Sequence, residues 1–123
     1  MATTNEPGRP LEFMISEANG RRSREQITLV SGAGALKAGT VLGKISASGK
    51  YQTYDNASGS AAVNVGAAIL CYDVDATSAD QLAAVIVRDA EVHSAGLLWG
   101  TNDGAGITAG KADLLALGVI VRD

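Results

Sequence analysis

The hydrophobic residues of this 123-residue chain fall into short runs, and stretches rich in Gly, Ser and Asp separate the runs. Leu11, Phe13 and Ile15 take every second position, which is the spacing of a β-strand with one apolar face. Two later runs, residues 66–74 and 82–88, are apolar on both faces and predict buried strands. Further short strands are predicted at residues 27–30, 40–45, 50–54 and 119–121.

The segments between the predicted strands also contain residues that indicate loops, a hairpin and a helix. Residues 31–39 predict a Gly/Ala loop, and residues 40–54 predict a hairpin in which Gly43 marks a bulge or a close backbone approach. Thr108 is expected to cap a short helix over residues 109–117. The apolar side of that helix would hold Leu114, Leu115 and Leu117, and Gly118 would end it in the left-handed conformation.

About seven short strands at regular spacing and one helix predict a mainly β fold. We expect a compact β-clip or small-barrel-like domain over residues 18–123, with one short helix in its C-terminal half. An extended N-terminal arm over residues 1–17 would precede it, because residues 1–10 are polar, contain Pro7 and Pro10 and show no periodicity.

The arm has no obvious partner inside the chain. A tight hairpin at Asn19-Gly20 would place Glu17 opposite Arg22 as an ion pair. The same register places Phe13 opposite Gln26, so the apolar faces of the two strands do not match. Either a bulge corrects the register, or the partner lies elsewhere in this chain or on another chain. We expect the second, with a strand that pairs with the sheet edge of another protein. Phe13 and Ile15 would then share one face of the strand, and Met14 would lie on the other.

Composition and charge narrow the function classes. The formal net charge of −3 gives no electrostatic footprint for nucleic acid. The longest apolar run, residues 65–72, is far shorter than the roughly 20 residues that span a bilayer, so we expect no membrane contact. No secretory signal is visible at the N-terminus, which favours synthesis in a reducing cytoplasm. Cys71 is the one cysteine, so it can form no internal disulfide and is expected to be a small core residue.

Each candidate catalytic or metal-binding motif in the sequence lacks a residue or a spacing that its chemistry requires. His93 is the only histidine, and its neighbour Ser94 would point to the opposite face of a strand, so we expect no catalytic residue. Residues 73–84 begin like a calcium loop but have Ser78 where Gly is needed and Ala84 where a carboxylate is needed. The Gly-Lys pairs lack the spacing of a phosphate-binding loop. We therefore expect no metal and no cofactor.

Two features remain open at this stage. Arg21, Arg22 and Arg24 form a basic cluster, and nearby glutamates favour ion pairing over docking of phosphate or a partner. Trp99 is the only tryptophan, and it is expected to be buried, either in the core or as an anchor in an interface.

Several segments together resemble the tailed-phage head decoration proteins of the lambda protein D type. The first is Glu-Phe-Met-Ile-Ser-Glu-Ala-Asn-Gly at residues 12–20, followed by Ser-Arg-Glu at residues 23–25. The others are residues 36–44, 73–77, 87–92 and 114–122. No single segment is chemically diagnostic, but their order and spacing are fairly specific, and they span most of residues 12–122. Residues 1–10 and 100–107 carry no part of the resemblance.

The resemblance implies a virion structural protein with no catalytic residue and no cofactor. Such proteins have a β-clip-type fold, assemble as homotrimers at local three-fold positions on the outer surface of the expanded head, and reinforce it against internal DNA pressure. Their N-terminal arm contacts the major capsid protein. Carried onto this sequence, the resemblance makes Leu11, Phe13, Met14 and Ile15 the capsid-binding residues of the arm, with Trp99 as a trimer or core anchor.

Two other function classes stay open. The first is a small β-barrel ligand-binding module, in which Trp99 and Tyr72 would line a deep apolar cavity. The second is an enzyme that uses His93, which would need a carboxylate within hydrogen-bond range.

Overall fold

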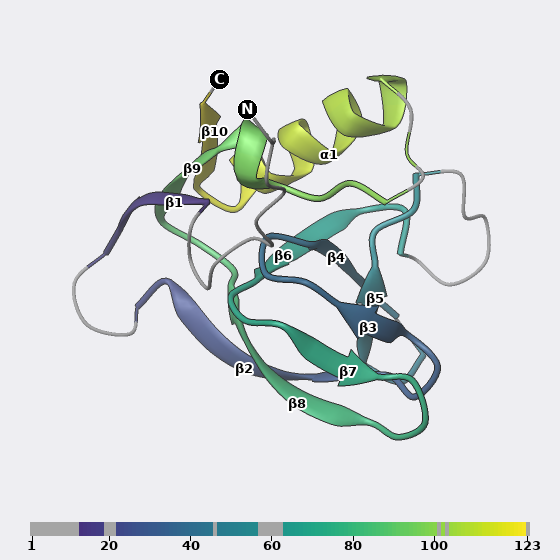
Figure 1. The fold of residues 1–123 in the computed structure, drawn as a ribbon. Coiled ribbons are helices and arrows are strands. Elements are labelled where there is room, and N and C mark those ends of the chain that lie inside the picture. Colours follow the sequence, from purple (N-terminus) through teal and green to yellow (C-terminus); the bar gives the residue numbers. More distant parts are fainter. Residues whose placement is uncertain are drawn as a thin grey trace, which may run out of the picture.

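The computed structural model describes residues 13–18, 22–45, 47–56, 63–100, 102 and 104–122. Within them the fold is mainly β, as the sequence predicts, with one α-helix (Figure 1). The elements are β1 (Met14–Glu17), β2 (Arg24–Leu29), β3 (Gly34–Leu36), β4 (Val41–Lys44), β5 (Tyr51–Thr53), β6 (Gly66–Leu70), β7 (Val74–Ala76), β8 (Gln81–Ile86), β9 (Ala90–His93), the 3-10 turn Ser94–Gly96, α1 (Gly104–Ala116) and β10 (Val119–Arg122).

Five strands close into a small barrel in the order β2-β5-β4-β6-β8. Register decides which residues fill its interior. Leu42 lies opposite Ala68, and Leu70 lies opposite Val85, so all four side chains share the inner side of the wall. They are fully buried there, together with Leu29 of β2. The short strands β3 and β7 pair with each other and pack against the same interior.

A second apolar layer covers part of the outer wall of the barrel. Val41, Ile69 and Ile86 lie side by side on β4, β6 and β8, with their side chains on the outer face. They pack against Val92 of β9, Val119 of β10 and other residues of the sheet β1-β9-β10, and against α1 (Figure 1). Strand β6 and the second half of β8 are therefore largely buried on both faces, which explains their continuous apolar runs.

The first strand has its partner inside the chain. β1 pairs antiparallel with β9, and β9 pairs in parallel with β10. The expectation of a strand without an internal partner is therefore wrong, although the partner does lie elsewhere than in β2. A register shift between Met14 and Ser16 also separates the faces. Phe13 is buried and Ile15 is exposed, so the two do not share a face. The turn residues Asn19 and Gly20 lie outside the described residues.

Other elements depart from the sequence pattern in informative ways. The loop expected over residues 31–39 contains β3, and the run 66–74 is divided between β6 and β7. The predicted hairpin of β4 and β5 is confirmed. So is the close approach at Gly43, where a Cβ atom would lie 2.5 Å from the carbonyl oxygen of Val63.

The helix begins earlier than predicted and packs by a different face. It starts at Gly104, so Thr108 lies inside it and donates a hydrogen bond to the Gly104 carbonyl at 2.9 Å. Its buried residues are Gly106, Gly110 and Leu114. Leu115 and Leu117 are exposed, contrary to expectation. Gly118 ends the helix with a φ of 86°, as predicted.

Candidate functional site

The edge strand β1 is the first candidate docking surface. It lies at one end of the three-stranded sheet, so one of its two edges pairs with β9 and no described strand covers the other (Figure 1). Ile15 projects outward beside that edge with 43% of its surface exposed. An unpaired edge with an exposed apolar residue is a template for another strand.

Phe13, directly before β1, fixes this strand to the hydrophobic core. Its side chain is 1% exposed and lies in the layer between the barrel and the sheet. Gly96 makes room for this residue, because a Cβ atom there would lie 2.8 Å from the Cα and Cβ atoms of Phe13. The Phe13 carbonyl also accepts a hydrogen bond from the His93 N–H at 2.7 Å. Phe13 is therefore a core residue of its own chain.

A charged clamp holds the other end of β1. Arg24 donates two hydrogen bonds to the Glu17 carboxylate, at 2.8 and 2.9 Å, and both side chains are about three-quarters buried, with 29% and 24% exposed. The guanidinium lowers the pKa of Glu17, and the same hydrogen bonds raise the pKa of Arg24. Such bidentate pairs fix geometry as well as adding energy. Beside the clamp, the buried Ser23 hydroxyl accepts the Ala18 N–H at 2.9 Å and donates to the Asp89 carbonyl at 2.8 Å.

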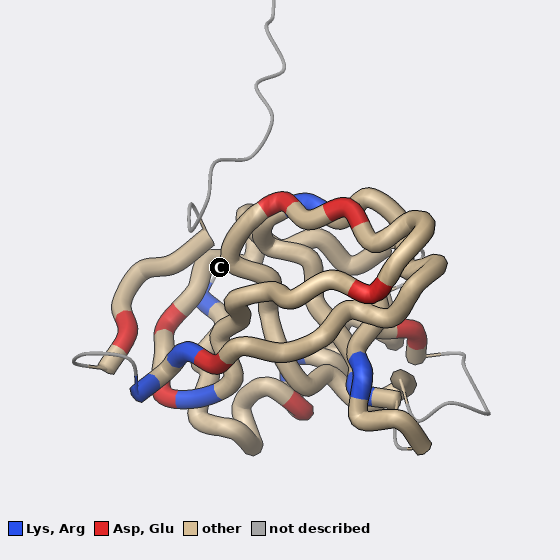
Figure 2. The backbone as a smooth tube through the Cα atoms, turned by 90° about the horizontal axis from the view of Figure 1, so that it is seen from below, with Lys and Arg blue, Asp and Glu red and all other residues tan. Residues whose placement is uncertain are grey.

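The basic cluster is engaged in ion pairs where the structure describes it. Arg24 binds Glu17, and Arg22 lies 3.4 Å from Asp89. Arg21 lies outside the described residues. Acidic and basic positions are interspersed along the backbone in Figure 2 rather than separated into two regions. Ion pairing, the favoured interpretation of the cluster, is therefore confirmed for Arg22 and Arg24.

The other three residues named for the arm differ in their surroundings. Leu11 lies outside the described residues. Met14 is half-buried and packs against the same apolar layer as Phe13, and Ile15 faces solvent. Of the four residues named for the arm, Ile15 is thus the one that the structure describes as exposed.

Trp99 is half-buried near the start of α1. Its ring meets the ring of Tyr54 edge to face, with 6.1 Å between centroids and an angle of 74°. Gly110 lies against both rings, since a Cβ atom there would lie 2.5 Å from Cζ3 of Trp99. Burial raises the pKa of Tyr54, whose hydroxyl donates to the Gly106 carbonyl at 2.8 Å. Trp99 therefore helps to seat the helix, and the glycine spacing of α1, which the sequence analysis did not use, is the signal for this contact.

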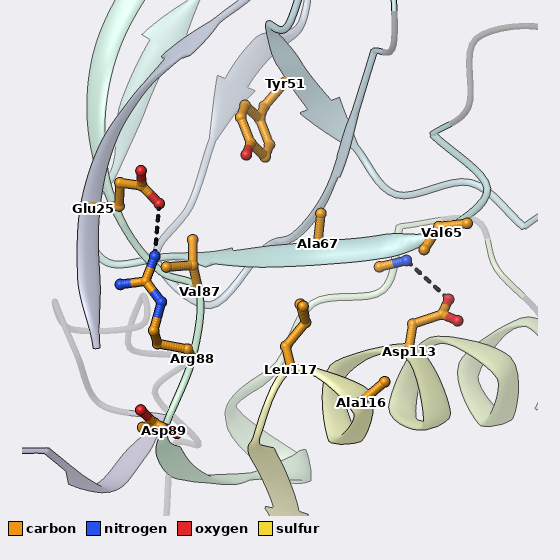
Figure 3. Close-up of a pocket in the computed structure, with 11 residues that line it drawn as sticks. Glu25, Tyr51, Val65, Ala67, Val87, Arg88, Asp89, Asp113, Ala116 and Leu117 are labelled. Carbon is orange, nitrogen blue, oxygen red and sulfur yellow. Dashed lines mark hydrogen bonds and ion pairs between the residues drawn. The ribbon is translucent and has the colours of Figure 1, made fainter. Parts of the chain in front are cut away.

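A groove between the barrel and α1 is the second candidate surface, and sequence reasoning missed it (Figure 3). It has a volume of about 590 Å³. Its apolar lining comes from Tyr51, Val65, Ala67, Val87, Ala116 and Leu117, which are far apart in the sequence. Neither Trp99 nor Tyr72 lines it, so the two aromatic residues proposed for a ligand pocket do not meet there.

The residues considered for chemistry do not form a site. His93 is exposed at the end of β9. Cys71 is fully buried, and burial raises the pKa of its thiol to about 11, which keeps it protonated, as expected of a core residue. Within the described ranges, no three His, Cys, Asp or Glu side chains are grouped to hold a metal ion. No helix in this part of the chain is long and apolar enough to cross a membrane.

Comparison with known proteins gives one clear result. A search of curated proteins returns no match. The family described as "Bacteriophage lambda head decoration protein D", in contrast, matches residues 3–119, which is nearly the whole chain. That family is one of structural phage proteins. The chain therefore belongs to the bacteriophage lambda head decoration protein D family and has the role of a phage capsid decoration protein.

Proposed function

We propose that this protein binds the outer surface of the phage head as a homotrimer and stabilises the head against the pressure of the packaged DNA. In this proposal the N-terminal residues 1–17 contact the major capsid protein, and no catalytic residue, cofactor or nucleic acid takes part. The protein is made in the host cytoplasm and joins the head afterwards. The observation that carries the proposal is the family match over residues 3–119.

The geometry of β1 supports a binding role for the N-terminal arm, but with a different division of tasks among its residues. Phe13 is buried in its own chain and β1 is paired with β9, so these residues act as the fixed root of the arm. Residues 1–12, including Leu11, supply the contact itself, and Ile15 extends it along the open edge of β1. Met14 supports this strand from the side of the core. A root that is fixed in the core can transmit load from the shell to the barrel.

The physics of a trimer suits a cement protein. Three copies joined at one site engage several shell subunits at once, and simultaneous engagement raises the effective concentration of every further contact. A protein that binds only the expanded lattice stabilises that lattice by mass action. Modest contacts by each arm are then sufficient.

The arm is tested by deletion. Removal of residues 2–12 leaves Phe13 and β1 in place, whereas removal of residues 2–16 would also remove a core side chain and destabilise the fold. We expect the shorter deletion to keep the thermal midpoint of the wild type and to lose tight binding to undecorated expanded shells in a sedimentation assay. Binding with wild-type affinity would show that the contact lies elsewhere on the molecule.

A further inference from the structure

The groove beneath α1 exposes apolar side chains that the fold does not use. Val65 is 51% exposed and Leu117 is 40% exposed, and Ala67 and Val87 also line the groove (Figure 3). Exposed apolar surface of this kind, hollowed and rimmed by charge, marks a place where another molecule binds.

The walls of the groove are held in place. Asp113 of α1 accepts a hydrogen bond from the Gly66 N–H of β6 at 2.9 Å, as Figure 3 shows. The helix also lies close to this strand, because a Cβ atom at Gly66 would lie 3.3 Å from the Gly110 carbonyl oxygen. A groove that exists before binding costs a ligand little ordering of the protein.

The rim of the groove is acidic. Glu25, Asp89 and Asp113 face it against a single cation among the lining residues, Arg88, which leaves a formal charge of −2. Arg88 is already held by the Glu25 carboxylate at 3.2 Å. Arg22 reaches Asp89 from outside the groove, but it is 73% exposed, and ion pairs of that kind are weak and easily exchanged.

One end of the groove lies close to the end of β1, the first candidate docking surface. Asp89 lines one end of the groove, and its carbonyl accepts a hydrogen bond from the N–H of Ala18, directly after β1, at 3.2 Å. One partner surface can therefore reach both the root of the arm and the acidic end of the groove.

From these observations we infer that the groove is a second docking site for the head shell, which takes an apolar side chain flanked by Lys or Arg from a shell protein. This inference rests on the proposed function, and it adds a contact that does not involve the arm. A second copy of this chain seated in the groove is a separate outcome, which the cross-linking test below distinguishes from a shell protein.

The first test measures the affinity of the full-length protein for undecorated expanded shells of the phage that encodes it. Val65→Glu and Leu117→Glu place a carboxylate in the groove at exposed positions, so the fold is retained. The matched control is Leu82→Glu, at a position that is 65% exposed and does not line the groove. We expect each groove variant to bind at least tenfold more weakly and the control to stay within twofold of the wild type.

The outcomes separate this inference from the proposed function. If the wild type fails to bind shells, the proposed function is wrong. If the wild type binds and both groove variants bind within twofold of it, the groove inference alone is overturned and the arm proposal stands.

A second test identifies the occupant without weakening the fold. A photoreactive Leu117→benzoylphenylalanine protein is bound to the same shells, irradiated and mapped by mass spectrometry. Cross-links to a shell-protein segment with an apolar residue next to Lys or Arg support the inference. Cross-links to a second copy, to residues 1–12 of this chain or to an acidic segment overturn it, and so does the absence of cross-links from bound protein.

Discussion

Phe13 occupies the point where the N-terminal residues meet the core. Its ring is buried in the layer between the barrel and the sheet, Gly96 lies against its Cα and Cβ atoms, and its carbonyl accepts a hydrogen bond from the His93 N–H of β9. Ile15, two residues later, makes no comparable contact and is 43% exposed. Two neighbouring apolar residues of one strand thus have different tasks, one in stability and one at the surface.

This division predicts different costs for truncating the two side chains. Phe13→Ala should lower the free energy of unfolding by about 3–5 kcal/mol, because it removes a buried ring and leaves a cavity. Ile15→Ala should lower it by about 1 kcal/mol or less, since the side chain is 43% exposed and leaves no closed cavity. Chemical denaturation followed by circular dichroism measures both. Equal costs for the two variants would contradict the assignment of Phe13 to the core.

Glu17 and Arg24 predict a pH dependence at the root of the arm. The hydrogen bonds from Arg24 lower the pKa of Glu17 in the folded protein. Their stabilisation is therefore present above the unfolded pKa of about 4.3 and is lost as the pH falls through the lower folded value. Because both side chains are partly solvated, the gain at neutral pH should be about 1 kcal/mol or less.

The measurement compares the wild type with Glu17→Gln by denaturation at pH 7 and at pH 3. We expect the wild type to be the more stable at pH 7 and the difference to shrink towards zero at pH 3. In an Arg24→Gln background, Glu17→Gln should produce no such pH-dependent difference. A constant difference across this range would show that the ion pair does not set the stability of the clamp.

At the scale of elements, α1 is attached through small residues. Gly106, Gly110 and Leu114 are spaced four residues apart, so they form one stripe of the helix. The glycines let the backbone of the helix approach Tyr54 and Trp99 closely, and the larger leucines at 115 and 117 are left outside. A helix attached in this way can border the groove without filling it.

This arrangement makes Gly110→Ala an informative substitution. In an exposed helix interior, alanine in place of glycine stabilises by about 1 kcal/mol. Here the new Cβ atom would lie 2.5 Å from the Trp99 ring and 2.9 Å from the Tyr54 ring. We therefore expect a net loss of about 1–3 kcal/mol in the free energy of unfolding, with a change in tryptophan fluorescence. Gly104→Ala is the control, because a Cβ atom there has no neighbour within 4 Å, and its stability should be unchanged or higher.

These elements also show how far the sequence alone can lead. Residues 66–70 and 83–86 can be found from the sequence, because these strand segments are mostly buried on both faces and therefore carry continuous apolar runs. The end of α1 is equally local, since Gly118 must adopt a positive φ. The leucines alone do not define the buried face of α1: Leu114 is buried as expected, but Leu115 and Leu117 are exposed, because close packing on the aromatic rings selects glycine for the rest of that face. The partner of β1 lies about 75 residues away in the sequence, and no local pattern reports that pairing.

Of the two candidate surfaces, the sequence indicates one and does not indicate the other. The sequence points to the N-terminal segment, because an alternating strand follows a polar stretch. It does not show that Phe13 faces inward, because the bulge in β1 breaks the alternation. The groove is invisible to sequence reasoning, since its lining combines β5, the start of β6, the residues after β8 and the end of α1. Only the closed barrel and the seated helix bring these positions together.

At the scale of the whole molecule, the proposed trimer predicts how shells fill. If three copies bind together, each bound copy raises the affinity of its site for the next, because the contacts between copies and those to the shell form at once. Shells exposed to about half the saturating amount of protein should then carry complete three-copy clusters beside empty sites, and cryo-electron microscopy of individual sites would show this. Deletion of residues 2–12 should reduce the number of filled sites and leave each remaining cluster complete. Isolated single copies, or pairs, at half saturation would contradict the proposed trimer while leaving the membership of the family untouched.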